Sequence, residues 1–189
     1  MSLMAREMDG RAIGIAQRAT EELPSTDREA FVEAMSGAVT GVNVVTTDGP
    51  AGMFGITVSA VASVSAEPPM ILACVNRRSP ACEAIRRNGV FCVNLLESGQ
   101  SAVSDTFAGR PANGAPFDFG CADWQTAPSG SPRLPGAVAS FDCVLEVAQE
   151  AGSHTIFIGR VVSAASAEGD ALAYCRRAYC TPARFGTDG

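Results

Sequence analysis

The 189-residue sequence has a single histidine, His154, and lacks the short motifs that mark the common nucleotide-binding folds. One histidine cannot form a histidine-rich zinc centre, which disfavours metal catalysis. Neither G-x-G-x-x-G nor G-x-x-x-x-G-K-[ST] occurs, so a Rossmann fold and a P-loop fold lose their main support. The absence of G-x-S-x-G argues in the same way against a serine hydrolase of the α/β type.

The sequence also lacks an excess of basic residues and any long apolar segment. Its net charge is -6 and its pI is about 4.8, with no basic stripe, so we expect no nucleic-acid partner. No segment approaches the roughly 20 apolar residues of a membrane-spanning helix. Charged residues interrupt the first residues, where a secretory signal would need an apolar core, so we expect neither secretion nor a membrane partner.

Seven cysteines are scattered along the chain, and an odd number does not suit a disulfide framework. Several lie in apolar segments such as ACV and VFCVN, which is typical of buried free thiols. These features predict a reducing, cytoplasmic location. The spacing Cys175-x4-Cys180 has no second pair beside it, and we do not expect it to bind metal.

The length and the 47% hydrophobic share fit one domain with a sizeable core. We expect residues 1–24 to form an arm or short helix and residues 25–189 to form the domain. Within the arm, residues 1–3 are interpreted as a cloning remnant, and the helix is expected at Arg11–Glu22. Thr26 and Glu29 have the spacing of a capping box, which predicts an amphipathic helix over Asp27–Val39.

Strand-like segments dominate the rest of the chain. They are Val42–Thr47, Met53–Val64, Met70–Val75, Val90–Leu96, Ala137–Ala148, His154–Ser163 and Ala171–Cys175. One helix is expected at Pro80–Arg87, with Ser79 as its N-cap, and another at Gly99–Ala108. Residues 109–136 are expected to form a long loop that contains a short strand near Cys121–Gln125. Helices and strands do not alternate, which favours a mainly β, antiparallel barrel with a few inserted helices.

Two stretches could bind an anion or a polar ring. Arg77 and Arg78 precede the helix that begins at Ser79 and Pro80, where free N–H groups and the helix dipole favour a phosphate. The alternative is an exposed, solvated arginine pair. In Gly55–Ala60, Thr57 and Ser59 project to one face, and the glycine allows a ligand to come close. Here the alternative is an ordinary solvated strand face.

Ten short fragments, taken in order, resemble one family. They are Phe31-x3-Met35, VNVVTTDGPAG, GITVSAVASVSAEPP, CVNRRS, FCVNLL, FAG, WQT, SFDC, GSHTIFIGRV and YCRRAY. The chain is similar over about Asp27–Tyr179 to the flavin reductases of two-component monooxygenases, which are FMN-binding split barrels. It looks especially like the reductase components of 4-hydroxyphenylacetate 3-monooxygenase and of the pyrimidine-ring-opening oxygenase.

The resemblance implies a homodimer that uses NADH or NADPH to reduce FMN or FAD and supplies reduced flavin to a partner oxygenase. No arginine set for a 2′-phosphate is identifiable, which favours NADH. The histidine of the family's Gly-x-His turn, which faces the nicotinamide, corresponds to His154. The implied flavin site consists of Met53, Phe54, Gly55, Ile56, Thr57, Ser59, Ala60, Cys74, Val75, Asn76, Arg77, Arg78, Ser79, Pro80, Asp105 and Thr106.

The sequence departs from the family at Val58, Ala60 and Cys175, so backbone contacts to the flavin are expected near the first two. No residue is assigned an obligatory proton transfer. Three alternatives stay open: a flavin- or haem-binding carrier or sensor, an oxidase of the pyridoxamine-phosphate type, and a structural dimerisation module.

Overall fold

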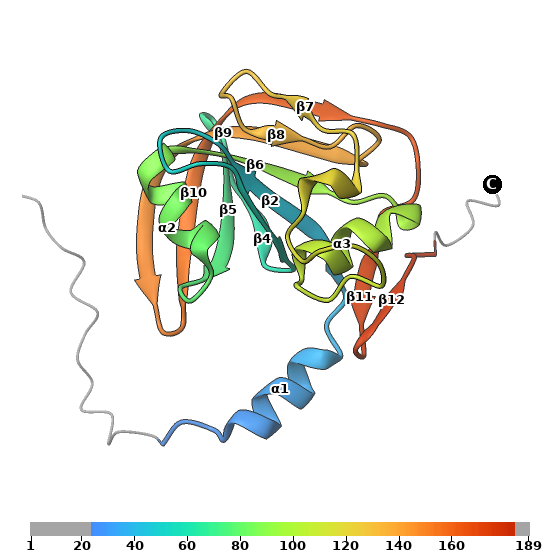
Figure 1. The fold of residues 1–189 in the computed structure, drawn as a ribbon. Coiled ribbons are helices and arrows are strands. Elements are labelled where there is room, and N and C mark those ends of the chain that lie inside the picture. The colour runs from blue at the N-terminus through green and yellow to red at the C-terminus, as the bar shows by residue number, and fades with distance from the viewer. Residues whose placement is uncertain (1–23, 184–189) are drawn as a thin grey trace, which may run out of the picture.

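The computed structural model describes residues 24–183, and Figure 1 shows their arrangement. The expected helix at Arg11–Glu22 lies outside the described residues. Three α-helices occur in 24–183: α1 Arg28–Ser36, α2 Pro80–Asn88 and α3 Ser101–Phe107, with 3-10 turns η1 Ser98–Gln100 and η2 Phe119–Cys121. None of the helices in this part of the chain is long and apolar enough to cross a membrane.

The same residues form twelve strands, and every pairing between them is antiparallel. The seven strands of the main sheet, in sheet order, are β3 Phe54–Val58, β2 Asn43–Thr47, β6 Val90–Leu95, β9 Ala139–Ala151, β10 His154–Ser166, β5 Pro69–Asn76 and β4 Val61–Ala66. The remaining strands are two or three residues long: β1 Thr40–Gly41, β7 Gln125–Thr126, β8 Pro132–Arg133, β11 Ala173–Cys175 and β12 Ala178–Cys180.

The strand order requires the main sheet to curl into a barrel. Strands β3 and β4 are the two edges of the sheet, yet only Ser59 and Ala60 separate them in the chain. In a flat sheet the two edges would lie about 29 Å apart, six spacings of about 4.8 Å. The link from Val58 to Val61 can span at most about 11 Å. The edges therefore approach one another, with Ser59 and Ala60 as the link between them. The N–H of Cys74 donates to the carbonyl of Ala60 at 2.9 Å, which extends the β4–β5 ladder into this link.

A hydrophobic core fills the barrel, and α2 closes one side of it. The core is built from strand side chains such as Val45, Val75, Phe91 and Phe157, with Ile85 of α2 packed among them. A second cluster lies under α3 and joins Val44, Leu96 and Phe107 to the aromatic residues of the following loop. The two helices α2 and α3 flank the barrel (Figure 1), and both contact β3.

Most of the expected elements are confirmed, and helix α2 agrees in detail. Ser79 is its N-cap, Pro80 its first residue, and Gly89 ends it at φ 70° in the left-handed region. The expected mainly β, antiparallel split-barrel class is likewise confirmed. The strand expected over Met53–Val64 is instead two strands, because the chain leaves one sheet edge at Val58 and enters the other at Val61.

Two further expectations differ from the structure in local detail. Helix α1 is capped by Asp27, whose carboxylate accepts from the N–H of Ala30 at 2.8 Å, and not by Thr26. The short strand expected near Cys121–Gln125 is replaced by η2 and the β7–β8 hairpin. That hairpin region covers the polar face of β9, so that Asp142 is only 2% exposed and accepts from the N–H of Ser129 at 2.8 Å.

Candidate flavin site

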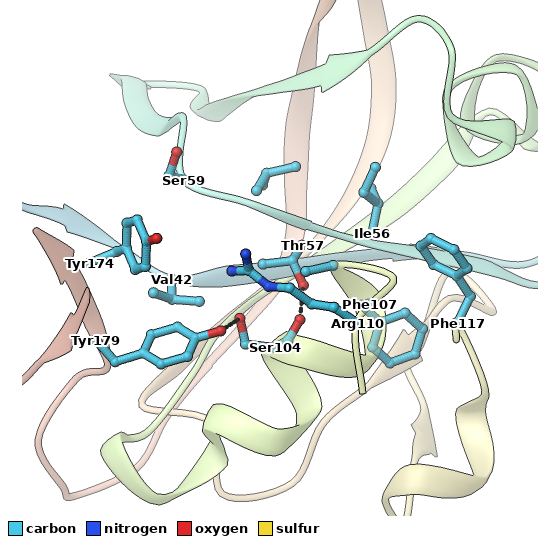
Figure 2. Close-up of a pocket in the computed structure, with 12 residues that line it drawn as sticks. Val42, Ile56, Thr57, Ser59, Ser104, Phe107, Arg110, Phe117, Tyr174 and Tyr179 are labelled. Carbon is cyan, nitrogen blue, oxygen red and sulfur yellow. Dashed lines mark hydrogen bonds between the residues drawn. The ribbon is translucent and has the colours of Figure 1, made fainter. Parts of the chain in front are cut away.

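Two neighbouring cavities lie along β3 and share the side chain of Phe117. The α3 cavity, about 360 Å³, is lined by Val42, Ile56, Thr57, Val58, Ser59, Ser104, Phe107, Ala108, Arg110, Phe117, Tyr174 and Tyr179 (Figure 2). The α2 cavity, about 210 Å³, is lined by Met53, Phe54, Gly55, Ser79, Pro80, Ala81 and Phe117. Strand β3 is thus the common wall of a groove with one helix at each end.

The side chains of β3 point to two opposite faces of the strand, and one of these faces is turned toward α3. Gly55 and Thr57 face α3, and a methyl group at Gly55 would lie 2.6 Å from the ring of Phe107. The Thr57 hydroxyl donates to the carbonyl of Ser104 at 2.7 Å, so this contact fixes the distance between strand and helix. Ser59, which follows the strand, is exposed and lines the α3 cavity.

The start of α2 offers fewer backbone donors than the sequence predicts. The N–H of Ala81 donates to the Ser79 hydroxyl oxygen at 3.3 Å, and the N–H of Cys82 to the Ser79 carbonyl at 3.0 Å. The N–H of Arg78 donates to the Asn76 side chain at 2.9 Å. What remains for an anion is the helix dipole, the Ser79 hydroxyl hydrogen and the guanidinium groups.

The two neighbouring arginines differ in their partners. Arg77 forms an ion pair with Glu150 at 2.9 Å and donates to the carbonyl of Gly152 at 3.4 Å, which joins the turn before α2 to the β9–β10 hairpin. Within residues 24–183, Arg78 has no carboxylate within ion-pair distance. Arg78 is therefore the better placed of the two to bind a phosphate.

His154 is the first residue of β10 and lies opposite Asn76 of β5 in the sheet register. Its Nδ1 is 2.9 Å from the Ser153 hydroxyl. The side chain is exposed and lies at the same end of the barrel as the Arg77 turn, since the N–H of Arg77 donates to the carbonyl of Ser153 at 3.0 Å. His154 lines neither cavity of the groove.

The other expected site residues are only partly brought together. Val75 is fully buried in the barrel core, and Thr106 is buried with its hydroxyl donating to Ala102 of its own helix at 3.0 Å. Burial also raises the pKa of the Cys74 thiol, which keeps that group protonated. Asp105 lies beside the α3 cavity, where it accepts a hydrogen bond from Tyr179 and pairs with Arg110.

Arg110 was not among the expected site residues. For Tyr174 and Tyr179, which flank an arginine pair, the sequence leaves open whether they stack on a ring or end the barrel. The Tyr179 hydroxyl lies 2.7 Å from Asp105 Oδ1 and 2.9 Å from the Ser104 hydroxyl, and Arg110 Nε lies 3.6 Å from the same Asp105 oxygen. The nearby hydroxyl groups of Tyr179 and Tyr174 raise the pKa of Arg110, and burial raises the pKa of Tyr179. The guanidinium is therefore charged and the phenol neutral at ordinary pH.

Phe117 is the second feature that sequence reasoning missed. Its backbone has φ 60°, in the left-handed region that a bulky side chain rarely adopts, and its N–H donates to the carbonyl of Thr106 at 3.0 Å. Its side chain is 50% exposed although it borders both cavities. Such backbone strain is typical of residues that contact ligands.

The groove has the composition expected for a flat, conjugated ligand with one charged end. Apolar side chains line most of the α3 cavity, hydroxyl groups and one guanidinium supply polar contacts, and the α2 cavity ends at a helix start. The groove thus fits an isoalloxazine ring joined to a phosphate. Fold and groove together define a split-barrel protein of the flavin-binding class.

Comparison with known proteins identifies the family. The model of the flavin reductase like domain matches residues 35–183. A relative from Methylorubrum extorquens, FMN reductase (NADH) RutF, is 43% identical over 166 residues, which cover 86% of this chain and 79% of that protein. The chain belongs to the flavin reductase family, and the resemblance inferred from the ten fragments is confirmed.

Solved structures agree with this assignment. A flavin reductase structure from Haemophilus somnus, described as putative, superposes with a TM-score of 0.77 at 34% identity, covering 83% of this chain and all of that one. BorF, the flavin reductase component of a bacterial two-component tryptophan halogenase, gives a TM-score of 0.74 at 33% identity over 84% of this chain and all of BorF. The match begins at residue 35, so the arm expected over residues 1–24 and the domain start at 25 stay predictions.

Proposed function

We propose that this protein uses NADH to reduce FMN and releases the reduced flavin to a separate oxygenase. The observation that carries the proposal is the 43% identity to a protein named FMN reductase (NADH), together with a groove whose walls suit a flavin. Relatives of known structure include a protein named NADH:FAD oxidoreductase, SgcE6, at 31% identity, so FAD is the second flavin to test.

The groove suggests how each end would be used. The flavin ring would lie in the α3 cavity against Ile56, Thr57 and Ser59, and the phosphate would reach Arg78 and Ser79 at the start of α2. When bound, the flavin supplies the hydride chemistry, while the protein supplies orientation and exclusion of water. His154 would contact the nicotinamide from the β9–β10 hairpin.

Loop 109–136 is placed to control flavin release, because its Phe117 stands between the two cavities. The proposal can be tested by replacing residues 112–115 with glycine and serine and measuring the FMN off-rate by stopped-flow fluorescence. We expect faster release, and an unchanged off-rate would contradict a gating role.

A homodimer and an oxygenase partner complete the proposal. Helix α1 buries none of its residues, and Phe31 and Met35 are 57% and 51% exposed, so a second copy has apolar surface to cover. Relatives such as BorF are flavin reductase components of two-component systems. A cytoplasmic location is supported by the seven cysteines, all of which are free.

The deciding experiment is steady-state oxidation of NADH and NADPH with FMN, FAD and riboflavin supplied in turn. We expect many turnovers with NADH and FMN. A carrier would consume no NADH beyond one equivalent, and an oxidase of the pyridoxamine-phosphate type would oxidise a phosphorylated amine and release peroxide without NADH. Failure to bind any flavin at micromolar concentration would leave only a structural role.

A further inference from the structure

Arg110 is the one ionised side chain among the residues that line the α3 cavity in the described chain. It follows α3, and its side chain is 63% exposed. Asp105 Oδ1 lies 3.6 Å from its Nε, and Tyr174 and Tyr179 of the β11–β12 hairpin line the same cavity. Figure 2 shows the guanidinium turned toward the two tyrosine rings, over the end of β3 that carries Ser59.

The reaction creates a negative charge that needs such a partner. A hydride brings two electrons and one proton, so FMN and NADH yield NAD⁺ and a reduced flavin with one additional negative charge. In a bound flavin this charge would be delocalised over the N1–C2=O end of the ring. A cation already in place stabilises the developing charge without reorganisation during the reaction.

The surroundings of Arg110 suit this transient charge better than a phosphate. Val42, Ile56, Val58 and Phe107 make the cavity largely apolar, which fits a ring. The phosphate has a separate place at the other end of β3, where Arg78 lacks an acidic partner within residues 24–183.

We propose that Arg110 is a catalytic residue of flavin reduction, whose guanidinium contacts the pyrimidine end of the ring and stabilises the negative charge formed by hydride transfer. Asp105, Tyr174 and Tyr179 are positioning residues that hold this guanidinium over β3. The inference rests on the proposed function, and it adds a side-chain cation to the backbone N–H groups that are expected to stabilise the reduced ring.

The test compares how tightly each variant binds oxidised and reduced FMN. For Arg110→Gln we expect reduced FMN, prepared with dithionite under anaerobic conditions, to bind about tenfold or more weakly, while oxidised FMN changes less than about threefold. If the affinity for reduced FMN falls tenfold relative to the affinity for oxidised FMN, the thermodynamic cycle lowers the midpoint potential of bound flavin by about 30 mV. The pKa of the reduced, bound flavin should rise, which its absorption spectrum reports as a function of pH.

Three further variants make the result specific. Arg110→Lys should recover part of the loss, because it restores the charge without the planar donor geometry. Tyr174→Phe keeps Arg110 but removes one of its hydroxyl partners, and should change the ratio in the same direction by less. The matched control is Arg160→Gln, because Arg160 pairs with Glu146 at 3.0 Å on the β9–β10 ribbon and lines neither cavity; it should leave both affinities unchanged.

Two outcomes would overturn the inference. Equal weakening of oxidised and reduced FMN would show that Arg110 binds a permanent charge such as the phosphate. Unchanged affinities in both redox states would place Arg110 outside the flavin contacts. Because dithionite replaces NADH in this experiment, a wild-type protein that binds FMN in a redox-dependent way but oxidises no NADH would refute the proposed function and the catalytic role, while a contact between Arg110 and reduced flavin would still be supported.

Discussion

The two ends of the β3 groove are built in different ways. The α2 end is a local structure, in which Arg78, Ser79 and Pro80 are consecutive and the helix start itself creates the field that an anion needs. The α3 end is assembled from distant segments, since Thr57 of β3, Ser104 of α3 and Tyr179 of β12 meet there. The α2 end is encoded in three consecutive residues, whereas the α3 end forms only when the barrel has folded.

This difference has a functional meaning. A phosphate carries its charge at all times, and a simple, exposed site with an arginine and a helix dipole is sufficient to hold it. In the proposed function the flavin ring gains a negative charge during the reaction, and the proposed role of Arg110 at the α3 end is to stabilise that charge. We therefore expect variants at the α2 end to change binding, and variants at the α3 end to change the balance between redox states.

The largest expected effect comes from crowding the contact between β3 and α3. In Gly55→Ala the new methyl group would lie 2.6 Å from the fully buried ring of Phe107, and overpacking of this kind should cost about 2 to 3 kcal/mol in the free energy of unfolding. Urea denaturation measures this value. FMN binding should weaken as well, because both cavities share the β3 wall.

Gly37→Ala is the matched control for that substitution. Gly37 has φ -75°, and its new methyl group would make only an ordinary contact of 3.5 Å with the carbonyl of Ala34. We expect no loss of stability at this position. Equal effects at Gly37 and Gly55 would show that the close approach of β3 to α3 does not matter.

The next effect in size concerns the phosphate. Arg78→Ala should weaken FMN binding by about 2 kcal/mol, or about 30-fold, because a charged hydrogen bond to the phosphate is lost. Riboflavin, which has no phosphate, should bind the variant as well as it binds the wild type. Isothermal titration calorimetry with both flavins gives the comparison.

Arg77→Ala is the matched control, since Glu150 already pairs with Arg77. Its effect on FMN affinity should be clearly smaller than that of Arg78→Ala. If Arg77→Ala proved the more damaging variant, the assignment of the phosphate to Arg78 would be wrong.

The smallest expected effect is the loss of one hydroxyl group at the α3 end. Tyr179→Phe removes the hydrogen bonds to Asp105 and Ser104 and should cost about 1 kcal/mol in the free energy of unfolding. In an Asp105→Ala background the same substitution should cost less, because one partner is already absent. Additive effects in this double-mutant cycle would mean that the two groups do not cooperate.

The parts of the fold that sequence reasoning predicted well are those with local signals. Ser79, Pro80 and Gly89 define α2 because capping chemistry depends on neighbouring residues. The strand expected over Ala137–Ala148 corresponds to β9, but the sequence did not predict that Asp142 is buried, because the loop that covers it is 13 residues away in the chain at Ser129. The split between β3 and β4 depends on closure of the whole sheet, which no local pattern reports.

The same distinction holds for the site. Family resemblance led to β3 and to the start of α2, which line the groove. It did not lead to Arg110 or Phe117, whose positions depend on tertiary contacts with the β11–β12 hairpin and on a left-handed backbone. The one available signal was that Arg110 directly follows the FAG fragment and that tyrosines flank the arginine pair in YCRRAY.

The pairing of strands also has a consequence for how quickly the chain can fold. In the main sheet, only the pairs β2–β3, β4–β5 and β9–β10 join strands that follow one another directly in the chain. Other pairs join distant segments, so that Val44 pairs with Asn94 and Met70 with Arg160. Contacts so far apart in sequence require large loops to close before any energy is gained. We therefore expect refolding on the millisecond-to-second timescale, with the long β9–β10 ribbon forming early and the junction at Ser59 and Ala60 last.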